Sequence, residues 1–203
     1  PIAGDVEVKN AEFIGIYIDG NHKLVISSGK INVSSEKTLY GMVGGNSSSM
    51  IVNGGDVTVE SSGSDQYGNG NGIDFGSFSM TDGKLSAKGY SVGLFAYQFS
   101  QTGGSIYAEG QIAPGILVGN GYSPSLTVKG EVEAVTSSPE RSAIQSYRSS
   151  ISINSVYYIE KPVGGRTEWD GNGQIIVNSD GTKANHVIIA KKPTFYDLYL
   201  AGT

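Results

Sequence analysis

Paired carboxylates are the residues of this chain whose types and spacing come closest to a known chemistry. Hydrolysis of a glycosidic bond uses two carboxyl groups about 5–10 Å apart, one as the acid and the other as base or nucleophile. The candidate pairs are Asp56 with Glu60 and Glu131 with Glu133. Most of these acids have a basic or neutral neighbour in the stacking that the repeats predict, which favours solvated surface charges. We therefore assign no catalytic residue from the sequence.

Two further signatures of polysaccharide-cleaving sites are incomplete. The chain has no adjacent pair of aspartates, and Arg141 and Arg148 have no cluster of acids near them. A calcium-assisted lyase needs several converging acids with an arginine or lysine as the base. A polysaccharide lyase or glycoside hydrolase acting on acidic polysaccharide is therefore the alternative function, and we expect a protein that is not an enzyme.

The sequence predicts no metal site and no cofactor. The two histidines, His22 and His186, are far apart and lack acids at ligand spacing, so we expect surface or capping roles for them. Cysteine is absent, which removes thiolate ligands and disulfides. Segment 68–74 is rich in glycine and ends in an aspartate, but it occurs once and lacks the Lys-Ser/Thr of a phosphate loop. A glycine-rich turn is the simpler interpretation.

Aromatic residues are the strongest candidates for binding. The chain has 12 tyrosines and one tryptophan, and several tyrosines fall in predicted loops. Exposed aromatic rings can stack on sugars while nearby Asn and Ser groups bond the sugar hydroxyls. The alternative is an aromatic stack that only covers the loops. The positions that we expect to contact glycans are Tyr67, Tyr97, Tyr122 and Trp169.

A repeated phrase runs through the chain and must position all of these side chains. It consists of a short apolar strand, a tight glycine turn and a second strand with alternating apolar residues, as in 51–60. Successive copies are 25, 26, 28, 21, 26 and 25 residues apart, which is typical of stacked repeats. The first apolar residue after each turn is Val6, Ile31, Val57, Leu85, Ile106, Val132 and, in a degraded copy, Tyr157.

The repeat predicts an all-β fold. A second phrase, a small residue followed by a short apolar strand, lies between the glycine turns, so each repeat supplies about three strands and almost no helix is expected. A sandwich or barrel would not return the same apolar positions in every unit. We therefore predict a right-handed parallel β-helix, a single-stranded solenoid of about seven coils and on the order of 30 Å long.

Charged positions support the same register. The residues after the glycine turns alternate in sign over the first four coils, and so do Glu60, Lys88 and Glu109 after the second strand. A slip of one residue would turn the apolar positions outward and set unlike residues together.

The repeat pattern ends after Pro162. Residues 1–162 are predicted to form the β-helix repeats, and 163–190 an atypical cap that covers the open apolar end of the solenoid. Residues 191–203 resemble the start of a following module or a tail, and the first residues already lie inside a repeat. We therefore expect a chain cut from a longer precursor.

Composition limits the partners. The net charge of -5 gives no basic footprint for nucleic acid and disfavours an anionic membrane surface. No apolar run approaches the length needed to cross a bilayer, so direct membrane insertion is not expected. We expect a monomer whose neighbours are domains of the same precursor.

The motifs resemble a family of large repetitive cell-surface proteins of gut Firmicutes. They are the repeats of the form I-x-V-x-G-G-x-V-x-V-x-S, the segment 160–165, the Asp-Gly…Ala-Asn-His-Val-Ile-Ile run of 180–189, and Tyr-Asp-Leu-Tyr at 196–199. Those proteins are described as pectin-lyase-like, carbohydrate-binding or uncharacterised. The resemblance implies a non-catalytic extracellular module in adhesion or glycan contact, with a host or dietary polysaccharide as partner. A purely structural stalk is the further alternative.

Overall fold

The computed structural model describes residues 1–35, 37–64, 70–119 and 124–194, and within them the chain is entirely β, with no helix. No helix of this described part is long and apolar enough to span a membrane. The strands are β1 (Val6–Lys9), β2 (Ile14–Ile18), β3 (Lys23–Ile26), β4 (Lys30–Ser35), β5 (Tyr40–Gly44), β6 (Ser49–Val52), β7 (Asp56–Ser61), β8 (Asn71–Met80), β9 (Lys84–Gly89), β10 (Leu94–Gln101), β11 (Ser105–Gly110), β12 (Ile116–Val118), β13 (Ser125–Val128), β14 (Glu131–Thr136), β15 (Ile144–Tyr147), β16 (Ile151–Ile153), β17 (Tyr157–Lys161), β18 (Arg166–Trp169), β19 (Gly173–Val177) and β20 (His186–Lys191).

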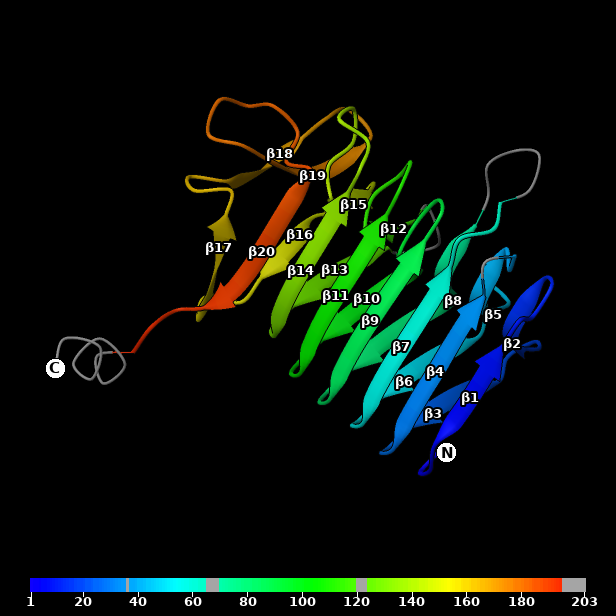
Figure 1. Cartoon of the computed structure of the whole chain (residues 1–203). Coiled ribbons are helices and arrows are strands. Elements are labelled where there is room, and N and C mark those ends of the chain that lie inside the picture. The colour runs from blue at the N-terminus through cyan, green and yellow to red at the C-terminus, as the bar shows by residue number, and fades with distance from the viewer. Residues whose placement is uncertain (36, 65–69, 120–123, 195–203) are drawn as a thin grey trace, which may run out of the picture.

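The strands wind into a parallel β-solenoid, which confirms the predicted architecture (Figure 1). Each coil contributes three strand positions. One position forms the parallel part of an eight-stranded sheet, in the order β1-β4-β7-β9-β11-β14. The other two form ribbons of a twelve-stranded sheet, and the long strands β8 and β10 run through both ribbons and join them. The outer surface of the eight-stranded sheet carries the candidate functional site.

The predicted apolar rows lie in register inside the solenoid. Val57 pairs with Ile31 on one side and Leu85 on the other, and the row continues through Ile106 to Val132. Within this row the residues from Ile31 to Val132 are at most 2% exposed. The opposite ribbon stacks aromatic rings: Phe78 and Phe99 are in register, with ring centroids 5.2 Å apart. Stacking like on like therefore builds one continuous core.

The solenoid has about five turns, so the prediction of seven coils is wrong by a small margin. The degraded copy forms β17, but β17 does not stack on β14. Instead β20 pairs antiparallel with β14, placing Ile189 opposite Val132, and β17 pairs antiparallel with β20. Strands β18 and β19 close the other sheet in the same way against β15. The returning strands take the open hydrogen-bonding edge before a further parallel coil can use it.

The glycine turns set the spacing between coils. Gly83 has φ +91°, and a Cβ at this position would lie 2.5 Å from the carbonyl oxygen of Gly55 in the coil before. That same oxygen accepts a hydrogen bond of 2.9 Å from the backbone N–H of Lys84. Glycine is therefore needed here both for the left-handed backbone and for the close approach of adjacent turns.

Candidate functional site

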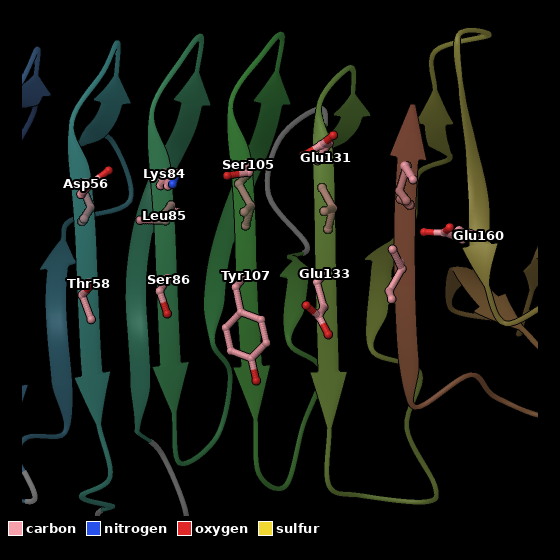
Figure 2. Close-up of a pocket in the computed structure, with 16 residues that line it drawn as sticks. Asp56, Thr58, Lys84, Leu85, Ser86, Ser105, Tyr107, Glu131, Glu133 and Glu160 are labelled. Carbon is pink, nitrogen blue, oxygen red and sulfur yellow. The ribbon is translucent and has the colours of Figure 1, made fainter. Parts of the chain in front are cut away.

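A groove of about 680 Å³ crosses the outer surface of the eight-stranded sheet (Figure 2). It runs across β7, β9, β11 and β14 to the antiparallel strands β20 and β17. Period-two alternation points every second residue of each strand outward, so neighbouring strands present their side chains in rows. The outward residues that line the groove are Asp56, Thr58, Lys84, Ser86, Ser105, Tyr107, Glu131, Glu133, Ile188, Ala190 and, from β17, Glu160.

Four carboxylates and one lysine line this groove. Glu131 and Glu133, one of the two candidate carboxylate pairs, lie two residues apart on β14 and both line the groove. Figure 2 shows Glu160 directed from β17 back toward β20, which adds a third glutamate that the sequence did not single out. Glu160 was missed because its strand joins the sheet only through the antiparallel end. The groove is therefore acidic.

The other predicted carboxylate pair is separated. Asp56 lines the groove, whereas Glu60 lies in a smaller depression of about 250 Å³. There the ammonium of Lys88 is 3.6 Å from the Glu60 carboxylate and 3.7 Å from that of Glu109. This row confirms the predicted alternation of charge, and it explains why Glu60 behaves as a surface charge. Exposed pairs of this kind contribute about 0–1 kcal/mol each.

Tyr107 is the aromatic side chain of the groove. Its row neighbours are Ser86 on β9 and Glu133 on β14. Its hydroxyl donates a hydrogen bond of 2.7 Å to Glu109, and the Lys88 ammonium lies 5.8 Å from the ring centroid. Burial, this hydrogen bond and the charges of Glu109 and Glu133 raise the pKa of Tyr107 well above its usual range. The phenol therefore stays protonated at neutral pH and does not act as a base.

A histidine joins the groove to the end of the solenoid. His186 on β20 is 2.8 Å from the Glu133 carboxylate through Nε2 and 2.8 Å from the Lys161 ammonium through Nδ1. Since a protonated lysine can only donate, Nδ1 is the acceptor and Nε2–H donates to Glu133. The contacts tie β14, β20 and β17 together, which fits the predicted capping role. His22 also has a local role, bonding through Nδ1 to the Asp19 carbonyl oxygen at 2.7 Å.

The predicted glycan-contact positions are not gathered in one place. Tyr67 and Tyr122 lie outside the described residues. Tyr97 is half-buried on β10, edge-on to Phe95, with its hydroxyl 3.4 Å from Asn46 Oδ1. Trp169 is 56% exposed at the end of β18, four strands further along the twelve-stranded sheet, or about 19 Å at normal strand spacing. Neither Tyr97 nor Trp169 lines the groove. The groove itself was not predicted from the sequence.

Asp74 is a titratable residue that the sequence reasoning missed. It points outward from β8 between Val43 and Phe95, and its carboxylate accepts a hydrogen bond of 2.8 Å from Asn71. Burial raises the pKa of Asp74 to about 6, and the bond from Asn71 opposes this only in part. The sequence does contain a signal for this residue. In the predicted stack Asp74 falls in a row where the adjoining coils carry valine and phenylalanine.

The described residues hold no group of three or more histidine or acidic side chains placed to bind a metal ion. Comparison with protein-family models, with curated proteins and with solved structures found no match for this chain. The function is therefore inferred from the chemistry of the groove.

Proposed function

We propose that this chain is a non-catalytic β-solenoid module that contacts glycans through the groove on the eight-stranded sheet. The observation that carries the proposal is the groove itself, a depression of about 680 Å³ whose lining combines an aromatic ring with hydroxyl and carboxylate groups. The proposal includes a place on the cell surface, as part of a larger protein, and that element rests on the sequence resemblance.

The side chains of the groove suit a neutral, hydroxyl-rich ligand. Tyr107 supplies an apolar ring face, and Ser86, Ser105 and Thr58 supply hydroxyls that both donate and accept hydrogen bonds. Carboxylates accept hydrogen bonds from sugar hydroxyls and need no positive partner for this. The strands repeat at about 4.8 Å, so an extended chain lying across them meets two outward side chains from each coil.

The acidic lining argues against acidic polysaccharide as a substrate. A polyuronate would bring further negative charge beside Glu131, Glu133 and Glu160, with only Lys84 among the lining residues to offset it. A lyase or hydrolase remains the rival function, because the groove does hold several carboxylates. Incubation with pectin and alginate decides this: new unsaturated uronate or reducing ends would replace our proposal, and a silent result on all glycans would leave a structural stalk.

Removal of the Tyr107 ring should weaken glycan binding about five- to tenfold, because an aromatic contact contributes about 1–1.5 kcal/mol. We expect Tyr107→Ala to show this loss in isothermal titration with neutral glycans that bind the wild type. Tyr107→Phe keeps the ring and should stay within about twofold. Trp169→Ala, outside the groove, should bind as the wild type does; a loss in this variant alone would place the contact surface on β18 instead.

A further inference from the structure

A second depression, of about 450 Å³, adjoins the groove at the edge of the eight-stranded sheet where the glycine turns lie. We call it the rim depression. The residues that line both it and the groove are Asp56, Lys84, Ser105 and Glu131. They are consecutive in one row, because Asp56 pairs with Lys84, Lys84 with Ser105, and Ser105 with Glu131. Figure 2 shows this shared row at the starts of the strands. The two depressions are therefore neighbours with a common wall.

The shared row separates two parallel tracks that both cross the strands. On the groove side, the next outward row consists of Thr58, Ser86, Tyr107 and Glu133. On the other side, the residues that line only the rim depression are Gly55, Asp82, Gly83, Gly104 and Tyr157. Successive outward residues of a parallel strand are about 6.6 Å apart, so the tracks lie close together. A linear chain can follow one track, but it cannot occupy both without doubling back.

The floor of the rim depression is made by the glycine turns. Gly55, Gly83 and Gly104 have φ of +83°, +91° and +71°, and each contributes to the lining. Because these residues have no side chain, a ligand can approach the backbone of the turns closely. Asp82 stands beside them, and one of its carboxylate oxygens accepts a hydrogen bond of 2.7 Å from the Gly83 N–H. Its second oxygen remains an acceptor for a ligand hydroxyl.

Tyr157 supplies the aromatic ring of the rim depression. The repeat pattern placed this residue in the inner apolar row, but β17 pairs antiparallel with β20, where Tyr157 lies opposite Lys191. The side chain is half-buried, packs against the core, and also lines the rim depression. A tyrosine ring provides a large contact area at a low cost in conformational entropy, and packing against the core restrains this one further. Each track therefore has one aromatic ring, Tyr107 in the groove and Tyr157 at the rim.

We propose that this surface binds a branched neutral glycan. The main chain lies in the groove against Tyr107, and a branch crosses the shared row to contact the glycine turns and Tyr157. The inference rests on the proposed glycan contact in the groove and adds the class of glycan. The shared row suits the crossing point, because its serine hydroxyl donates and accepts hydrogen bonds, its lysine donates, and its carboxylates accept.

Isothermal titration of the wild type with matched linear and branched oligosaccharides tests the inference. The pairs are cellotetraose with xyloglucan heptasaccharide, and mannotetraose with its galactosylated form. The branched member of a pair should bind about five- to tenfold more tightly than the linear member, with one molecule per chain, because it adds one aromatic contact. Equal affinities, or two linear molecules per chain, overturn the branch and leave the glycan contact of the groove standing. Binding of none of the four overturns both.

Variants of Tyr157 locate the branch. Tyr157→Leu keeps an apolar side chain against the core but removes the flat ring, so it should lower the affinity for the branched member to that for the linear one. Tyr157→Phe keeps the ring and should keep the preference, whereas Tyr107→Ala should weaken both members. A loss of the linear glycan in Tyr157→Leu would place the main chain on the rim and contradict the proposal. The comparison of wild-type affinities does not depend on how well this variant folds.

Discussion

Gly83→Ala is expected to lower the free energy of unfolding by about 2–5 kcal/mol. An alanine in the left-handed region costs about 1–2 kcal/mol by itself. At position 83, where φ is +91°, the new Cβ would also lie 2.5 Å from the Gly55 carbonyl oxygen. A contact this short forces the two turns apart, which adds about 1–3 kcal/mol.

The clash at Gly83 cannot be relieved by a side-chain movement. The obstructing atom belongs to the backbone, and the hydrogen bond from Lys84 N–H holds it in the ladder that joins the two coils. Moving it would disturb the register of β7 with β9, and with it the rows above and below. The loss should therefore be seen as a lower unfolding midpoint in urea.

Gly171→Ala is the matched control. Gly171 has almost the same backbone angle, φ +92°, but no atom lies within 4 Å of the position its Cβ would take. This variant should lose only the conformational part, about 1–2 kcal/mol. The difference between the two variants measures the contact between stacked turns. Equal losses would show that coil spacing at the glycine turns is not tight.

The coils could be predicted from the sequence because each one repeats the same local information. Val57 and Leu85 occupy the same place after a glycine turn, and a parallel stack is the arrangement that sets them in register. The antiparallel end could not be predicted in this way. The pairing of Ile189 with Val132 depends on which strand reaches the free edge, and no local repeat records that competition.

The groove could not be predicted from the sequence either, because the antiparallel strands β20 and β17 form one end of it. Tyr107 lies on a strand, in the same row as Thr58 and Ser86. The sequence indicated glycan contacts at tyrosines in predicted loops, so Tyr107 was not among the candidates. Tyr107 becomes a candidate contact residue only in the folded structure, where β20 and β17 complete the groove and add Glu160 to its lining. The sequence predicted surface charges for the carboxylates, and Glu60 agrees with this prediction. Glu60 pairs with Lys88 on the adjacent parallel strand, and the repeat pattern is enough to place these two residues together.

Asp74→Asn is expected to stabilise the protein at neutral pH and to leave it unchanged in acid. The pKa of Asp74 is raised to about 6 from 3.8, chiefly by burial, so the folded state disfavours the ionised carboxylate. Below pH 3.8 the acid is protonated in both states and costs nothing. As pH rises from there to about 6, the unfolded state ionises first and the free energy of unfolding falls. The full deficit is at most about 3 kcal/mol, and we expect about 1–3 kcal/mol.

Urea unfolding of the wild type and Asp74→Asn at about pH 3.5 and about pH 7.5, on either side of this window, tests the expectation directly. The amide oxygen that the substitution introduces still accepts the hydrogen bond from Asn71, so the gain at neutral pH should reflect only the lost charge. Asp180→Asn is the control of opposite sign. Hydrogen bonds from Thr182 lower the pKa of Asp180, so its contribution is present at neutral pH and disappears as the pH falls. A benefit of Asp74→Asn that is the same at both pH values would show that the Asp74 carboxylate is not the destabilising group.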